Sequence, residues 1–303
     1  MKRSLLIILI LCGYVLAGRA QQYPETSLYS INPYLINPGF TGYLSDLSGY
    51  VSARSPLSVQ ENEIRSYRVG LNQAIEKSNI GIGGKLTYDQ RDFFESVYVD
   101  FSFAYKIVMG NKRVFSLGTD IGIVNRSYNL DNLSSTVDLT DPTLSSDYYY
   151  KTNFKMGIGL AYYSTHIEAG IAMPYMLEGS ENLTTYFNAY LAYKHYFSHD
   201  EWLLKPNLYW VTYPDATDML NVSLMVERRD KFWGQLGATT TKELLFAMGF
   251  KFQIYELSYS YAHNIEGNQP PYKSSNEIML RIHYGKSNKV IAHIATKQNR
   301  KGY

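Results

Sequence analysis

Hydrophobic and polar residues alternate along most of the chain between Leu47 and Gly285. From Val97 to Ile107 every second residue is apolar, and the positions between them hold polar or small residues. Because successive side chains of a strand point to opposite faces, this period of two predicts β-strands with two unlike faces. The alternating runs begin near residues 47, 65, 79, 95, 112, 152, 165, 184, 202, 218, 232, 243, 254 and 274, which predicts about fourteen strands.

The length of these runs separates a membrane barrel from a soluble β-sandwich. Most runs are about 9–12 residues long, the length that a tilted strand needs to cross a bilayer. Strands of soluble sandwiches average about 5–6 residues. The aromatic residues collect near the ends of runs, as in 148–150, 162–163 and 193–197, where a barrel carries its aromatic girdles. We therefore expect an all-β, antiparallel transmembrane barrel.

The connections between runs alternate in length. We number each connection by the run that it follows. The even-numbered connections are tight: 76–78, 109–112, 164–165, 198–201, 230–231 and a turn at 253. Most odd connections are longer: 55–64, 89–94, 126–151, 174–183 and 263–273, although those near 213–217 and 239–242 are short. Bacterial outer-membrane barrels have short periplasmic turns, longer outer loops and an even number of strands. The connection pattern therefore favours an outer-membrane barrel.

Composition agrees with a barrel in a membrane. Tyrosine supplies 29 residues against 13 Phe and 3 Trp, and its ring and hydroxyl suit bilayer interfaces. Charged residues make up 18 % of the chain, below the roughly 25 % of soluble domains. The net charge of +2 gives no reason to expect nucleic acid as a partner. The slightly negative mean hydropathy excludes a bundle of membrane helices.

The first twenty residues are typical of an export signal. Lys2 and Arg3 precede an apolar run over residues 5–11, and the sequence Gly18-Arg19-Ala20 predicts cleavage before Gln21. A lipoprotein signal at Cys12 is the alternative, but Leu11 stands where that signal has a small residue. After cleavage at the predicted site the chain has no cysteine, and hence no disulfide or cysteine metal site.

The polar faces of the predicted strands must line the barrel lumen. Against lipid, each Lys or Arg near the midplane would cost roughly 2–4 kcal/mol. Glycine on the same face leaves room for an inserted segment, but neither feature decides whether a channel is open. The charged and glycine positions are Arg68, Lys85, Asp100, Lys106, Asp120, Lys155, Glu168, Arg281, Gly81, Gly83, Gly118, Gly122, Gly157, Gly159 and Gly170.

Residues 21–46 precede the first predicted strand and lack the alternation of apolar and polar residues that marks strands. They contain two Asn-Pro pairs, Asn32-Pro33 and Asn37-Pro38, followed by Gly42. Asn favours turns, and the proline of each pair excludes a continuous helix. We expect a compact plug or cap at the mouth or in the lumen of a barrel over residues 47–285, followed by a basic periplasmic tail over 286–303.

In this stretch the chain resembles the PorP/SprF family of type IX secretion system membrane proteins. The family begins its mature chain with a similar NP-x-x-INP-x-x-x-G stretch, matched here by Asn32, Pro33, Ile36, Asn37, Pro38 and Gly42. Two looser likenesses are the Phe232-Trp233-Gly234 step and a pair of strands at 257–261 and 275–280. The resemblance spans nearly all of the mature chain.

The resemblance implies an outer-membrane component of type IX secretion in a Gram-negative bacterium, linked in some members to gliding. It implies a secreted surface adhesin, or the C-terminal domain of one, as the partner that the barrel helps to export or anchor. Periplasmic peptidoglycan-binding proteins, other components of the system and outer-membrane lipid are further implied partners. Our candidates for partner contact are Asn32, Pro33, Asn37, Pro38, Gly42, Tyr148, Tyr149 and Tyr150.

No residue pattern predicts a catalytic site, a cofactor or a metal site. The six histidines form no HExxH motif. Two alternatives to the secretion role remain: a porin-like or fatty-acid-transporter-like barrel, and an outer-membrane hydrolase with Asp89, Arg91 and Asp92 in an outer loop. His166 and Glu168 could form an acid–base pair, and the acidic connection 126–151 could bind calcium or an adhesin.

Overall fold

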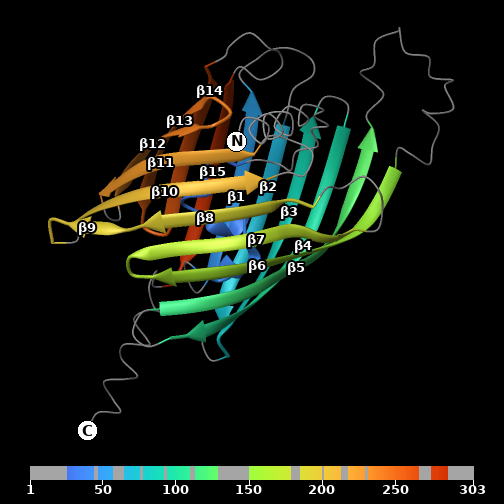
Figure 1. The fold of residues 1–303 in the computed structure, drawn as a ribbon, viewed down its shortest axis with the longest axis horizontal. Coiled ribbons are helices and arrows are strands. Elements are labelled where there is room, and N and C mark those ends of the chain that lie inside the picture. The colour runs from blue at the N-terminus through green and yellow to red at the C-terminus, as the bar shows by residue number, and fades with distance from the viewer. Residues whose placement is uncertain are drawn as a thin grey trace, which may run out of the picture.

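The chain forms a closed antiparallel β-barrel in a computed structural model (Figure 1). The structure describes residues 26–43, 47–56, 65–75, 78–91, 94–109, 113–128, 150–178, 185–199, 201–212, 218–228, 231–265 and 274–285. The strands are β1 (Leu47–Pro56), β2 (Arg65–Ile75), β3 (Ile80–Arg91), β4 (Phe94–Val108), β5 (Arg113–Tyr128), β6 (Tyr150–Ser164), β7 (Ile167–Glu178), β8 (Phe187–Tyr193), β9 (His195–Phe197), β10 (Trp202–Thr212), β11 (Met219–Arg228), β12 (Phe232–Thr239), β13 (Glu243–Phe252), β14 (Tyr255–Asn264) and β15 (Ser274–Tyr284).

Each strand pairs with its neighbour along the chain, and β15 pairs with β1 to close the ring. The short β9 and β8 both pair with β10 and are separated by Lys194 alone, so together they form one strand of the wall. The described wall therefore has fourteen strands, which confirms the predicted all-β barrel and its strand count. Among the described residues, no helix is long and apolar enough to cross a membrane.

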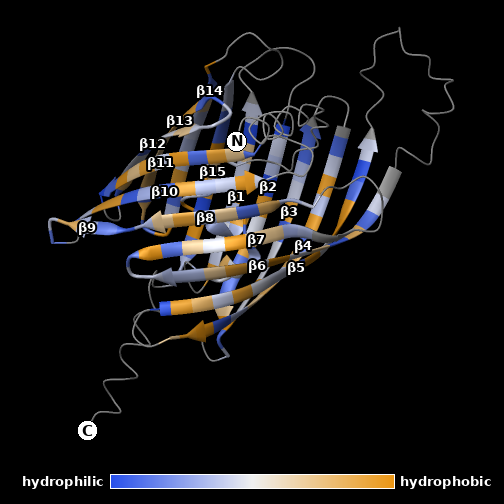
Figure 2. Cartoon of the chain, viewed as in Figure 1, coloured by the Kyte–Doolittle hydropathy of each residue, from blue (hydrophilic) through white to orange (hydrophobic). Residues whose placement is uncertain are grey.

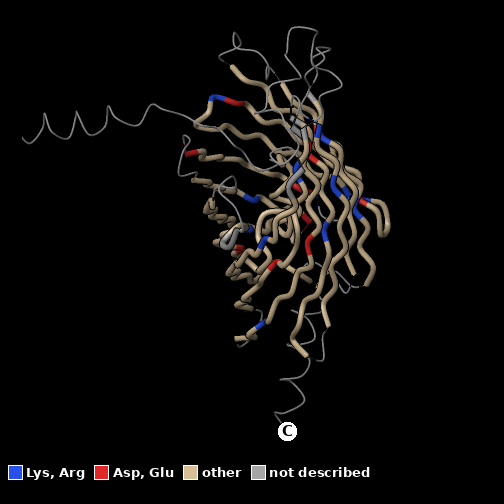
Figure 3. Tube along the Cα trace, turned by 90° about the vertical axis from the view of Figure 1, so that its right-hand side faces the viewer, with Lys and Arg blue, Asp and Glu red and all other residues tan. Residues whose placement is uncertain are grey.

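The two faces of the wall differ as the alternation predicts. Outward side chains are apolar and exposed, as at Phe101 on β4 and Leu236 on β12, and the apolar positions recur along the strands in Figure 2. All eight charged residues that the sequence assigns to the lumen are buried. Charged positions of both signs are spread over many strands (Figure 3), and inside the barrel cations and anions pair directly, as Lys85 does with Asp120.

The ends of the barrel follow from its connections. β1 begins and β15 ends at the same end as the tight turns, which we call the periplasmic end because outer-membrane barrels place their short turns there. The opposite end, with the long 129–149 connection, is called the outer end. Strands β4, β5 and β6 have 15, 16 and 15 residues, longer than the predicted run length.

Two predicted outer connections are partly strand. Residues 174–183 are expected to form one of them, but β7 continues to Glu178. Residues 89–94 were expected to form a longer outer connection, but β3 continues to Arg91 and β4 begins at Phe94. Asp89 is a buried strand residue whose carboxylate accepts a hydrogen bond from the Ser66 hydroxyl. The hydrophilic residues at the end of β3 suggested a loop, although Asp89 occupies an inward position. The predicted signal peptide over 1–20 and tail over 286–303 lie outside the described residues.

Candidate functional site within the barrel

The residues ahead of β1 fill the inside of the barrel. All residues from Leu28 to Gly42 are buried, and they include the short 3-10 helices η1 (Pro33–Leu35) and η2 (Pro38–Phe40). Their partners come from wall strands on both sides of the lumen, and the blue coil behind β7 and β8 in Figure 1 is this segment. We call residues 26–43 the lumen segment.

The two Asn-Pro pairs start the two helical turns. Pro33 and Pro38 each stand in the first turn, where the missing N–H and the fixed φ of proline cost nothing. The Asn37 side chain accepts the Gly39 N–H at 2.7 Å and so caps η2. Asn32 has no side-chain cap bond, and no described group hydrogen-bonds its buried amide.

Asn37 also ties the lumen segment to the wall. Its amide nitrogen donates to the carbonyl oxygens of Leu160 at 2.9 Å and Ile171 at 3.1 Å, which face each other across β6 and β7. Asn188 on β8 donates to the Ile36 carbonyl at 3.0 Å. One asparagine thus serves as cap and as wall contact, which explains why the second pair needs Asn at this place.

Glycines on the inner face of the wall allow the backbone of the lumen segment to lie close against the strands. A Cβ on Gly118 of β5 would lie 2.3 Å from the Pro38 carbonyl, and one on Gly81 of β3 would lie 2.2 Å from the Thr41 oxygen. Real Cβ atoms do not approach backbone atoms this closely, so any side chain at either position would displace the segment. The glycine-rich inner face is therefore shaped to the lumen segment.

The segment leaves the lumen at the periplasmic end. Gly42 has a φ of +68°, a conformation that favours glycine. Its N–H donates to Asn72 at 3.0 Å, and the Lys106 ammonium donates to its carbonyl at 2.6 Å. Lys106 lies close to the end of β4 at Val108, so this contact fixes the chain just before β1 begins.

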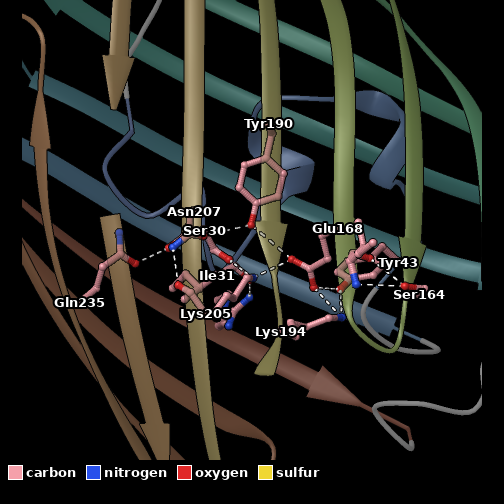
Figure 4. Close-up of polar contacts among 12 residues, drawn as sticks. Ser30, Ile31, Tyr43, Ser164, Glu168, Tyr190, Lys194, Lys205, Asn207 and Gln235 are labelled. Atoms are coloured by element: carbon pink, nitrogen blue, oxygen red, sulfur yellow. Dashed lines mark hydrogen bonds and ion pairs between the residues drawn. The ribbon is translucent and has the colours of Figure 1, made fainter. Parts of the chain in front are cut away.

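Glu168 forms the centre of one polar network inside the barrel (Figure 4). Its carboxylate pairs with Lys194 at 3.0 Å and Lys205 at 2.7 Å, and it accepts hydrogen bonds from the hydroxyls of Tyr43 and Tyr190.

This network also reaches the first part of the lumen segment. The Lys205 ammonium donates to the Ser30 carbonyl at 2.8 Å, and the Ser30 hydroxyl donates to Gln235 at 2.5 Å (Figure 4). Three parts of the chain are thereby joined: the segment, β7–β10 and β12.

A second network holds the amino end of the segment against β15. The Glu277 carboxylate accepts the Thr26 hydroxyl at 2.8 Å and the Ser27 N–H at 2.8 Å, and pairs with Arg68 of β2 at 3.3 Å. Further along β15, Arg281 donates to the Ile31 carbonyl and pairs with Glu256 at 2.5 Å.

A third network crosses β3–β6. Lys85 pairs with Asp120 at 2.6 Å, and Lys155 pairs with Asp100 at 2.7 Å. The Tyr34 ring of the segment lies 4.8 Å from the Lys85 ammonium. The described inner charges are thus held mainly by one another and by the segment.

The structure divides the predicted contact residues into two groups. Asn32, Pro33, Asn37, Pro38 and Gly42 all lie in the lumen and are buried. Tyr148 and Tyr149 lie outside the described residues, and Tyr150 is the first residue of β6 with its side chain outside the description.

The sequence interpretation missed four residues that hold the networks together: Lys194, Lys205, Glu256 and Glu277. Glu277 shares its strand face with Arg281, and Lys205 is separated by one residue from Leu203 and Asn207, so the alternation alone could have placed them inside. The suggested pair of His166 and Glu168 is not formed, because His166 is exposed in the turn after β6 and contacts the Lys194 carbonyl at 3.1 Å. The described part of the chain contains no group of His, Cys, Asp and Glu suited to a metal ion.

Fold and interior define an outer-membrane β-barrel whose lumen is occupied by its own N-terminal segment. A family model described as type IX secretion system membrane protein PorP/SprF matches residues 18–282. The chain therefore belongs to the PorP/SprF family, whose members are non-enzymatic outer-membrane components of type IX secretion in Gram-negative bacteria. A search of curated proteins found no match.

Solved structures of other barrels share the fold. The CymD monoaromatic hydrocarbon channel superposes with a TM-score of 0.51 at 11 % identity, covering 88 % of this chain and 94 % of CymD. The Pseudomonas putida toluene transporter TodX gives 0.50 at 10 % identity, covering 84 % and 94 %. CdiB from Acinetobacter baumannii gives 0.45 at 6 % identity, covering 80 % of this chain, which spans only 60 % of CdiB. At such identities CymD and TodX support the barrel fold alone.

Gly118→Ala tests the fit between the wall and the lumen segment. The new methyl group would collide with the Pro38 backbone, so we expect the free energy of unfolding in detergent to fall by about 1–3 kcal/mol. Gly234→Ala on β12 is the matched control, because nothing lies within 4 Å of a Cβ there, and its effect should stay within about 0.5 kcal/mol. Equal stabilities of the two variants would contradict the close fit.

Glu168→Gln tests the central network. Lys194 and Lys205 would lose their buried carboxylate, so we expect a loss of about 3–5 kcal/mol in the same unfolding measurement. The control is Glu227→Gln, whose pair with Lys251 is more exposed and should contribute less than about 1 kcal/mol. If both variants lose the same free energy of unfolding, burial of the Glu168 network does not account for its contribution to stability.

Proposed function

We propose that the barrel is a non-conducting binding partner for an exported surface protein of the adhesin type, which it helps the type IX system to export or to anchor. The supporting observation is the occupied lumen, in which Leu28 to Gly42 are buried against the wall. A barrel whose interior is filled by its own chain is suited to present a rigid rim and loops to another protein. Membership of the PorP/SprF family supports the connection to secretion.

The contact surface in this proposal is the outer rim, above all the connection between β5 and β6. This connection carries Asp131, Asp138, Asp141 and Asp147 and ends in the tyrosines at 148–150. Tyrosine is among the residues that contribute most to protein interfaces. We propose that Tyr148, Tyr149 and Tyr150 contact the adhesin or its C-terminal domain.

We assign the Asn-Pro residues an indirect role in partner binding. Asn32, Pro33, Asn37, Pro38 and Gly42 are buried, so a partner at the rim does not reach them in this arrangement. They shape the segment that supports the wall from inside, and the wall positions the rim. Peptidoglycan-binding proteins and other secretion components would meet the periplasmic turns and the tail.

Replacement of residues 130–149 by a short Gly/Asn turn, combined with Tyr150→Ala, tests the proposed contact at the outer rim. We expect the shortened barrel to fold but to recover about tenfold less surface protein in a gentle-detergent pull-down from native membranes, as loss of interface anchors predicts. The same replacement of the 266–273 connection is the control and should leave recovery nearly unchanged. If the full-length chain recovers no surface or periplasmic protein, the secretion-partner role fails.

Bilayer conductance distinguishes the anchor from a transport barrel. Because the lumen segment occupies the interior, the purified chain should show no large, steady single-channel current. The double variant Glu168→Gln with Glu277→Gln weakens the contacts between the lumen segment and the wall. It should show more frequent brief channel openings, because the segment leaves the lumen more often. A steady large current in the unaltered chain would overturn the non-conducting proposal and favour transport.

A further inference from the structure

One row of outward side chains at the periplasmic end of the wall combines aromatic rings with a cation. The row crosses five strands, from β9 to β13, and its members pair in register: Phe197, Trp202, Arg228, Phe232 and Phe250. Phe197 ends β9, Trp202 begins β10 and Arg228 ends β11, so the row lies at the edge of the wall, where β9 and β10 meet at the left of Figure 1. We call these five residues the periplasmic row.

The rings of the periplasmic row support the guanidinium of Arg228. Its central carbon lies 6.0 Å from the centre of the Trp202 ring, within the range of a cation–π contact. The Trp202 ring centre lies 6.4 Å from that of Phe197 and 6.2 Å from that of Phe232. Within the described part of the chain, no carboxylate pairs with Arg228. The charge therefore rests on an aromatic surface with its N–H donors open to a ligand.

The indole of Trp202 offers a further donor beside this cation. Its N–H has no acceptor among the described residues, whereas the other two tryptophans have one. Trp210 donates to Asp218 at 3.3 Å, and Trp233 donates to Glu256 at 2.7 Å. Guanidinium groups bind phosphate oxygens through two parallel hydrogen bonds, and an indole N–H can add a third. The pair of Arg228 and Trp202 thus has the chemistry of a phosphate site.

A gap in the apolar outer surface lies beside the periplasmic row, on its membrane side. Gly234 is two residues after Phe232 on the same face of β12, about 7 Å further into the bilayer. It is exposed, and a Cβ at this position would meet nothing within 4 Å. Its register partners, Val226 on β11 and Met248 on β13, are large and exposed. The missing side chain between them leaves space for an acyl chain.

We propose that the periplasmic row and the gap at Gly234 bind one phospholipid of the periplasmic leaflet. Arg228 and the Trp202 N–H bind the phosphate of its headgroup, and one acyl chain lies over Gly234. Rings at the bilayer interface suit any outer-membrane barrel, but a girdle of rings does not account for an arginine in its midst. A cation beside hydrocarbon needs an anion, and the lipid phosphate is at the depth where the strands end.

The proposed lipid site is separate from the role in secretion. All five residues of the periplasmic row face outward, whereas the lumen segment is held by inward side chains such as Glu168 and Glu277. The proposal therefore does not depend on the exported partner or on the state of the lumen.

Native mass spectrometry of the full chain, purified from membranes and delipidated in a mild detergent, tests the site. The probe is dioleoyl phosphatidylglycerol. We expect the unaltered chain to retain one molecule, and Arg228→Gln to lower the retained fraction about tenfold at equal lipid concentration, because the paired hydrogen bonds to phosphate are lost. Gly234→Leu, which fills the gap, should also lower retention although Arg228 is intact.

Arg113→Gln is the matched control. Arg113 is an exposed arginine at the first position of β5, at the same end of the barrel, and no aromatic ring of the described residues lies against it. This variant should retain the lipid as the unaltered chain does. Equal retention by Arg228→Gln and Arg113→Gln would overturn the proposal.

A second measurement uses the unaltered chain alone, so its result does not depend on how the variants fold. Dioleoylglycerol has the same acyl chains without the phosphate, and we expect about tenfold less of it to be retained than of phosphatidylglycerol. Equal retention of the two lipids would show that the surface holds acyl chains without recognising phosphate, and would overturn the site. Preferential retention of added lipid A would contradict the assignment to a phospholipid.

Discussion

Pairing of buried charges inside the barrel is the interaction on which the rest of the structure depends. An isolated ion moved away from water costs several kcal/mol even after the protein relaxes, and a buried carboxylate or ammonium is tolerated only with partners. Here Glu168, Glu277 and Glu256 each pair with a cation from another strand of the wall. Glu168 and Glu277, and the cations Lys205 and Arg281, also bind backbone or hydroxyl groups of the lumen segment, so wall and segment satisfy one another.

The alternation of the sequence predicted the wall well because strand geometry leaves little choice. Inward charges such as Lys85 and Lys155 could be assigned by parity alone, since the lipid face would not accept them. Partners across the lumen could not be assigned in this way. Arg68 pairs with Glu277 far along the chain because the ring closes between β15 and β1, and closure is not encoded in any local pattern.

Hydrophilic residues at the ends of strands were wrongly predicted to be loops. Asp89 was placed in a loop, yet it faces the interior beside Ser66. A strand that continues beyond the apolar band carries hydrophilic residues on both faces, and its sequence then resembles a loop. The two Asn-Pro pairs were correctly expected to form turns, but the wall contacts of Asn37 depend on strands β6 and β7, which no inspection of residues 32–42 reveals. The local turns of the lumen segment could therefore be predicted from its own residues, whereas its contacts with the wall could not.

The contacts of β15 with the lumen segment couple closure of the barrel to its interior. Glu277 and Arg281 belong to the last described strand, and they bind Thr26, Ser27 and Ile31 near the start of the described chain. The same strand pairs with β1 and completes the ring. The contacts that hold the segment therefore also hold the seam, so that the wall and its contents form one cooperative unit.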